Sequence, residues 1–209
     1  MRYFIFMVVF LASVAFSGLA SADGNRAELN KVAQIFKGGE YARAAVELKK
    51  YVAKYPQDPI AWTILGHAYE ELDQDTNAEE AYLSALKADP STYQAITGLG
   101  IVARKRGELE KAEAFYKKAL EINPKYADAY SSLVIIAIKR GNFDSAVAYG
   151  KKGYALDANN AVIAANLAVA YHYAGDHDRR DEMTEVARLL NYHNMKNLNR
   201  IYKGEIDVR

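Results

Sequence analysis

The sequence predicts an all-α protein built from repeated helical hairpins, and three features of its 209 residues support this fold class. First, several residue types recur at a spacing of 34 residues. Second, each period contains two amphipathic stretches of about a dozen residues with helical periodicity. Third, glycine separates the two stretches and proline closes the period, as helix stop signals do. Each period is therefore expected to fold as helix, turn, helix.

Four columns of identical residues carry the period. They are Leu65, Leu99, Leu133 and Leu167; Ala44, Ala78, Ala112 and Ala146; Gly39, Gly107, Gly141 and Gly175; and Pro56, Pro90 and Pro124. Asp73 fills the gap in the glycine column, and Ala158 takes the fourth proline position. A single hairpin of this size cannot bury its apolar face alone, so neighbouring units are expected to stack.

The second period identifies a family. It contains, in order, Trp62, Leu65, Gly66, Tyr69, Ala78, Tyr82, Ala85 and Pro90. This order resembles the signature of the tetratricopeptide repeat (TPR) family, W-x2-L-G-x2-Y, then A-x3-F, then P. The third period keeps most of the pattern, whereas the fourth departs from it at Gly150 and Gly153. The resemblance implies a right-handed superhelical solenoid of about five TPR units, closed by a C-terminal capping helix.

The expected domain organisation follows the period. After a leader of residues 1–22, a TPR array over residues 23–191 is divided into units 25–58, 59–92, 93–126, 127–160 and 161–191. Residues 192–209 are expected to form the capping helix and a frayed tail, because the apolar stripe of Met195, Leu198, Ile201 and Tyr202 lies on one side only.

The first 22 residues have the layout of a cleaved signal peptide. Arg2 is followed by an uncharged, mostly apolar run that ends in Ala20-Ser21-Ala22. We expect cleavage after Ala22, which makes the chain exported and periplasmic. The alternative is an uncleaved anchor in the inner membrane, facing the periplasm. Intact mass separates the two readings, because cleavage leaves a chain that begins at Asp23.

Composition excludes several classes of function. The chain has 27 Lys plus Arg and 26 Asp plus Glu, so its formal net charge is only +1 and does not favour binding to nucleic acid. The absence of Cys removes thiolate nucleophiles, Cys-ligated zinc and iron–sulfur clusters. No nucleophile elbow or phosphate-binding glycine loop occurs. We therefore expect no enzyme, no cofactor and no metal.

His172 and His177 are the one pair of histidines close enough in sequence to consider as metal ligands, with Asp176 and Asp178 beside them. Their spacing of five residues spans the Gly175 turn and lacks the i, i+4 arrangement of helical zinc sites. The more ordinary reading is that the aspartates cap a helix. An enzyme or small-ligand binder based on these histidines is kept as the third alternative.

One helix is more apolar than packing in the array requires. Its apolar residues are Tyr130, Leu133, Val134, Ile135, Ile136, Ala137 and Ile138. A helix that is apolar nearly all round is buried or binds something. The TPR resemblance implies that the first helices line a concave groove. The groove residues expected are Thr97, Ile101, Arg104 and Lys105; Ser131, Ile135, Ile138 and Lys139; and Val169, His172 and Tyr173.

An apolar floor with a basic rim suits a protein or peptide segment that has apolar anchors and some acidic character. The sequence thus predicts a non-catalytic scaffold or adaptor of the cell envelope. The second reading is a TPR subunit of a larger envelope complex, tethered by an uncleaved N-terminal segment. The capping helix or a partner protomer could instead cover the groove, and a homodimer through the terminal units stays open.

Overall fold

The structure, a computed structural model, describes residues 25–208. The expected leader of residues 1–22 lies outside the described residues. Within them the chain is all helical, with a helix over residues 25–37 followed by α2 to α11. The further bounds are α2 Tyr41–Lys54, α3 Pro59–Glu71, α4 Asp75–Ala88, α5 Tyr93–Lys105, α6 Leu109–Ile122, α7 Ala127–Lys139, α8 Phe143–Leu156, α9 Ala161–Tyr173, α10 His177–Leu189 and α11 Met195–Tyr202.

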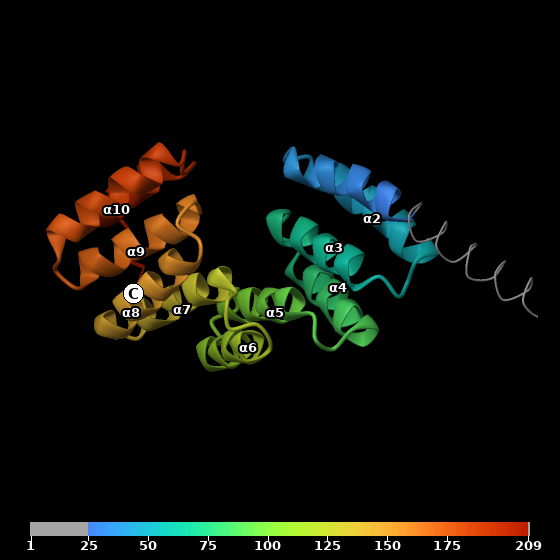
Figure 1. The fold of residues 1–209 in the computed structure, drawn as a ribbon, viewed down its shortest axis with the longest axis horizontal. Helices are drawn as coiled ribbons and strands as arrows, with labels where there is room; N and C mark the ends of the chain where they lie inside the picture. The colour runs from blue at the N-terminus through green and yellow to red at the C-terminus, as the bar shows by residue number, and fades with distance from the viewer. Residues whose placement is uncertain (1–24, 209) are drawn as a thin grey trace, which may run out of the picture. The chain divides into compact units, whose positions relative to one another are not determined.

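The helices pair as hairpins, as predicted, with α3 against α4, α7 against α8 and α9 against α10 (Figure 1). Packing divides the chain into two compact units, up to Gly98 and from Leu99 onward, with the boundary inside α5. In the first unit α2 also contacts α3, and in the second α8 contacts α9. The all-α fold of stacked helical hairpins predicted from the sequence is therefore confirmed.

The turn inside each hairpin explains the glycine column. Gly107 has a φ of 81°, in the left-handed region that glycine enters without a steric penalty. The amide of the next residue, Glu108, donates to the carbonyl of Ala103 at 2.9 Å and closes the helix end. Asp73 adopts the same region, with a φ of 54°, where glycine is missing from the column. The glycine column thus marks the positions at which the first helix of each hairpin ends.

The alanine column lies where two helices come closest. Ala44, Ala78, Ala112 and Ala146 are each 0% exposed. A tyrosine on the second helix fills the remaining space in two hairpins, because Tyr82 and Tyr116 are also 0% exposed. Small residues beside large ones give interdigitated packing, which is what buries the apolar face of each hairpin.

The last helix continues the repeat. α9 begins at Ala161 and α11 begins at Met195, 34 residues later, in the phase of α3, α5 and α7. α11 contacts α9, and its Leu198 is 2% exposed in a cluster with residues of α7 and α9. α11 is therefore a shortened first helix of a sixth unit. It covers the end of the array, as the capping-helix prediction requires.

The tail after α11 is not frayed as expected from the sequence. The Tyr173 hydroxyl donates to Asp207 Oδ1 at 3.2 Å, and the Val208 amide donates to the Tyr173 hydroxyl at 3.3 Å. Val208 also packs against the same apolar cluster as Leu198. Gly204, with a φ of 71°, turns the chain back after α11 so that the tail reaches α9.

Candidate functional site

The expected groove residues lie on the first helices α5, α7 and α9, and their burial divides them into two groups. Ile101, Arg104, Ile135, His172 and Tyr173 are half-buried, and Lys105 and Lys139 are exposed. The buried group consists of Thr97, Ser131, Ile138 and Val169, with 3%, 5%, 0% and 5% exposure. Thr97 belongs to the unit that ends at Gly98, so it is described apart from the others.

Two of the buried residues correct the expected groove. Ile138 and Val169 lie in the apolar cluster that contains Leu198 of α11. α11 occupies the next first-helix position and contacts α9, and its Leu198 is part of the same buried cluster. The alternative in which the capping helix covers this surface therefore applies to these two residues, and they form core rather than an open floor.

The excess apolarity of α7 has the same explanation. α7 contacts α6, α8 and α9, so it is surrounded by other helices on most sides. Leu133, Val134, Ile136 and Ala137 are all at most 5% exposed. Ile135 is the half-buried exception in this run. Most of the apolar residues that suggested a binding surface are thus buried by the packing of the array.

Ser131 holds α7 against α9. The Asn166 side-chain amide donates to Ser131 Oγ at 2.8 Å, and Ser131 is 5% exposed. Satisfying a buried hydroxyl from the neighbouring helix fixes the relative position of the two helices. Ser131 is therefore a structural residue of the second unit, with no polar group left facing solvent.

Four of the accessible groove residues are two cations and two isoleucines on α5 and α7. We call Ile101, Arg104, Ile135 and Lys139 the basic patch. Ile101 packs against a core cluster to which α7 contributes Leu133 and Ile136. Neither Arg104 nor Lys139 forms an ion pair within the described residues.

The neighbouring Arg140, unlike the two cations of the basic patch, forms ion pairs within the fold. Its guanidinium pairs with Glu113 and, at 3.1 Å, with Glu110, both on α6. The hydrogen bond from Lys117 and, after it, the bond from Arg140 lower the pKa of Glu113. Arg140 is thus neutralised within the fold, whereas the charges of Arg104 and Lys139 are available to a partner.

His172 lies at the junction of α9, α10 and α11, where aromatic rings surround it. Its ring centroid is 5.0 Å from that of Tyr202, 5.1 Å from that of Tyr173 and 6.3 Å from that of His177. Among residues 25–208, no three His, Asp or Glu side chains gather closely enough to hold a metal ion. Asp176 caps α10 by accepting from the Arg179 amide at 3.2 Å, which is the ordinary role expected for this aspartate.

The surroundings of His172 give stability a pH dependence. Burial, with Arg180 and His177 nearby, lowers the pKa of His172 below its ordinary value of 6.5. Tyr202, whose pKa burial raises to about 12, is neutral in this range. The unfolded chain therefore binds more protons than the folded one below pH 6.5. The stability is complete above that pH and decreases as the pH falls from 6.5 through the lower pKa that His172 has in the folded chain.

We expect the melting temperature to decrease as the pH is lowered from 7.5 to about 5, more steeply in the natural protein than in His172→Phe. Thermal unfolding followed by circular dichroism at a series of pH values measures this difference. His193→Gln is the matched control, because His193 is exposed, and it should keep the natural slope. An equal slope in His172→Phe would contradict the assignment.

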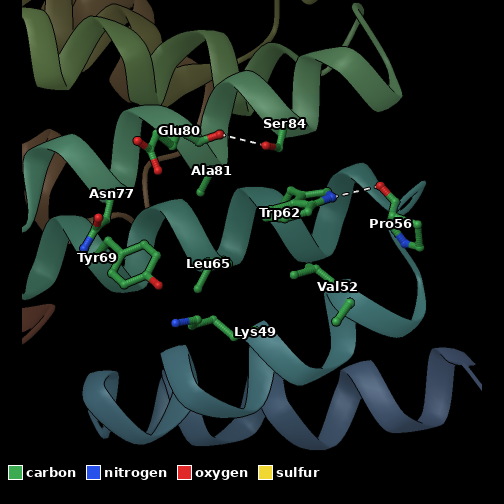
Figure 2. A pocket seen from close by; sticks show the side chains of 11 residues that line it. Lys49, Val52, Pro56, Trp62, Leu65, Tyr69, Asn77, Glu80, Ala81 and Ser84 are labelled. Atoms are coloured by element: carbon green, nitrogen blue, oxygen red, sulfur yellow. Dashed lines mark hydrogen bonds between the residues drawn. The ribbon is translucent and has the colours of Figure 1, made fainter.

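A cavity that the sequence reasoning missed lies in the first unit. It has a volume of about 620 Å³ and lies over α3, between α2 and α4 (Figure 2). Trp62, Leu65 and Tyr69 form its floor, with Lys49 on the α2 side and Glu80 on the α4 side. The signal in the sequence was the stripe of the three floor residues, but those positions are also core positions of the repeat.

Within residues 25–208, no helix is both long and apolar enough to cross a membrane.

Comparisons with known proteins agree with the hairpin architecture. A family model described as the middle TPR-like domain of cilia and flagella-associated protein 70 matches residues 86–190, and one described as tetratricopeptide repeat matches residues 36–93. Peroxisome biogenesis protein 5 of Arabidopsis thaliana is 30% identical over 86 residues, which are 41% of this chain and 12% of that protein. The chain thus spans only a small part of that relative.

Solved structures share the fold at low sequence identity. A thermophilic TPR protein of Thermus thermophilus has a TM-score of 0.73 and 22% identity, over 86% of this chain and 97% of that one. YrrB, described as a TPR protein with an unusual peptide-binding site, has a TM-score of 0.53 and 20% identity, over 86% of this chain and 91% of that one. Together with the matched repeat models, these likenesses lead to one conclusion. The chain belongs to the tetratricopeptide repeat family.

Proposed function

We propose that this chain is a non-catalytic scaffold of the cell envelope that holds a segment of a partner protein on the basic patch. TPR proteins of this kind bind protein partners, and YrrB is described as having a peptide-binding site. The observation that carries the proposal is that Arg104 and Lys139 form no ion pair within residues 25–208 and lie on the same two helices as the half-buried Ile101 and Ile135.

The chemistry of the patch defines its partner. Ile135 and Ile101 offer apolar surface for an anchor, and the two cations attract carboxylates at short range. An extended or helical segment with an apolar side chain next to acidic residues satisfies both. Export by the leader of residues 1–22 would bring the scaffold to the periplasm, and the intact mass described above distinguishes this from a membrane-tethered chain.

The charge reversal Lys139→Glu tests the patch without disturbing the fold, because Lys139 is exposed. We expect it to weaken capture of the partner by about tenfold, since one attraction becomes a repulsion. The measurement is cross-linked capture from cell envelopes, quantified by mass spectrometry. The same reversal at exposed Lys118 on α6 is the control.

Supporting the proposal requires a set of proteins captured by the natural chain and by Lys118→Glu but lost with Lys139→Glu. A photo-reactive residue in place of Ile135 should cross-link the same proteins. If both reversals capture identical sets, or if cross-links form from position 118 and not from position 135, the partner uses a different surface and the proposal fails.

A further inference from the structure

The cavity over α3 is a built cleft with a defined floor and two charged walls. We call it the α3 cleft. The Trp62 indole N–H donates to the Pro56 carbonyl at 2.9 Å, which fixes the ring at one end of the floor (Figure 2). Lys49 comes from α2 and Glu80 from α4, so the two charges lie on opposite walls with Leu65 and Tyr69 between them.

A related arrangement recurs in the second unit, 102 residues later in the sequence, with Ala164 at the position of Trp62 and Arg179, which lies over the Tyr171 ring, at the position of Asn77. A cavity of about 390 Å³, which we call the α9 cleft, is lined by residues of α8, α9 and α10. Eight of its lining residues stand at the positions of eight residues of the α3 cleft. They are Lys151, Tyr154, Ala155, Leu167, Tyr171, Arg179, Glu182 and Met183. In particular, Lys151, Tyr171 and Glu182 correspond to Lys49, Tyr69 and Glu80.

The repeat itself does not require this trio. At the positions of Lys49, Tyr69 and Glu80, the two middle periods carry Leu83, Ala103 and Ala114, and Lys117, Ala137 and Ala148. These periods fold into the same hairpins without the tyrosine or the glutamate. The lysine, tyrosine and glutamate occur together at the two clefts. The hairpin fold does not need them, because the middle periods form hairpins without the tyrosine or the glutamate.

The charged walls have no structural partner. Within the described residues, Lys49, Glu80, Lys151 and Glu182 are exposed and form no ion pair, with each other or with other groups. Lys117, which occupies the lysine position in a middle period, instead pairs with Glu113 at 2.6 Å. A lysine and a glutamate kept apart across an apolar floor are complementary to a ligand that brings an acid to one wall and a base to the other.

The size of the floor limits the ligand. Trp62 and Tyr69 are seven residues apart on α3, which is about 10 Å along the helix. The apolar floor of Leu65 and Trp62 suits one aliphatic side chain in the middle of the segment.

We propose that the α3 and α9 clefts are two related peptide-binding sites, each of which binds a partner segment of the pattern acid, aliphatic, base. The acid pairs with Lys49 or Lys151, the aliphatic side chain contacts the floor, and the base pairs with Glu80 or Glu182. These sites lie between second helices and use none of the residues of the basic patch. Tests of these two sites are therefore independent of tests of the proposed function.

Trp62 provides a direct test, because it is the single tryptophan of the chain and lies in the α3 cleft. The probe is a capped heptapeptide, Gly-Ser-Asp-Leu-Lys-Ser-Gly. We expect a saturable change in Trp62 emission on titration and two bound peptides per chain by calorimetry. Peptides in which Asp-Leu-Lys is replaced by Asp-Leu-Asp, Lys-Leu-Lys or Asp-Ser-Lys should bind about tenfold more weakly or not at all.

Charge reversals separate the two sites. Lys49→Glu should abolish the change in Trp62 emission and leave one bound peptide, and it should create binding of the Lys-Leu-Lys peptide at the α3 cleft. Lys151→Glu should keep the emission change and also leave one bound peptide. Lys50→Glu is the matched control, because this exposed neighbour pairs with Glu47 at 2.8 Å and does not line the cleft. It should behave as the natural chain does.

Circular dichroism of each variant checks that the helices are intact, which is expected because all three lysines are exposed. The proposal is overturned if millimolar peptide leaves Trp62 emission unchanged. It is also overturned if Lys50→Glu weakens binding as much as Lys49→Glu does, or if the four peptides bind alike.

Discussion

Replacing Tyr82 with alanine is expected to lower the free energy of unfolding by about 3–5 kcal/mol, because it removes a large, fully buried ring. The Tyr82 side chain is 0% exposed. Its ring fills the space beside two glycines, since a Cβ atom at Gly66 would lie 2.4 Å from the ring and one at Gly98 would lie 2.3 Å from it. Both glycines are on first helices, so the ring joins α4 to α3 and to α5.

The hydroxyl of Tyr82 adds a smaller contribution. It donates to Glu70 Oε2 at 2.8 Å and lies 2.8 Å from His67 Nδ1. Tyr82→Phe keeps the ring and loses these bonds, which should cost about 1 kcal/mol. Urea unfolding of the two variants, followed by circular dichroism, measures both effects. A loss in Tyr82→Ala no larger than that in Tyr82→Phe would contradict the role given to the ring.

Leu198→Asp is expected to detach α11 and to destabilise the C-terminal end of the array by about 3–5 kcal/mol. Leu198 is 2% exposed in a cluster of hydrophobic residues that includes Ile138 and Val169, so a carboxylate placed there loses its hydration. Release of α11 would expose α9, which it contacts, and free the tail from Tyr173.

Hydrogen exchange measures the effect segment by segment, because local opening lowers amide protection where contacts are lost. We expect α9 and α11 to lose protection in Leu198→Asp while α3 and α4 keep theirs. Lys196→Asp is the control, since it introduces the same side chain at an exposed position of the same helix. Unchanged protection of α9 in Leu198→Asp would show that α11 does not hold this end of the array.

Combining Leu198→Asp with Lys139→Glu connects the stability of the C-terminal end with partner binding. If detaching α11 makes Ile138 and Val169 accessible, the surface beside the basic patch becomes larger and more apolar. Capture of a partner by Leu198→Asp that survives Lys139→Glu would then identify binding to this newly exposed surface. The comparison therefore tells whether the capping helix limits which segments the array accepts.

The architecture could be predicted because each residue column has a local cause. A left-handed turn favours glycine, a closely packed helix pair requires alanine, and an apolar stripe at i, i+3 and i+7 marks the face that is buried. Gly107, Ala78 and Leu65 satisfy these conditions in the structure. Hairpin boundaries and the TPR family follow from such columns without any knowledge of long-range contacts.

The candidate site was predicted less well, because accessibility is not a local property. Ile135 and Ile138 are three residues apart and chemically alike, yet Ile135 is half-buried and Ile138 is fully buried in the cluster that contains Leu198. The pattern of apolar residues in α7 does not reveal whether its last turn faces solvent or another helix. Similarly, Trp62 and Tyr69 occupy core columns of the repeat, and the cleft above them exists because α2 and α4 leave space there.

The helices, their turns, their pairing into hairpins and the family could be predicted from the sequence, because they depend on interactions within one period. Which apolar residues stay accessible and which charges stay unpaired depends on the packing of different periods against one another. That outcome depends on what packs from neighbouring periods: Ile138 and Val169 are buried in one cluster with Leu198 of α11, Glu110 and Glu113 neutralise Arg140, and within the described residues no acid reaches Lys139 or Lys49. Whether a side chain is available to a binding partner depends on these packing neighbours, which come from other periods of the chain.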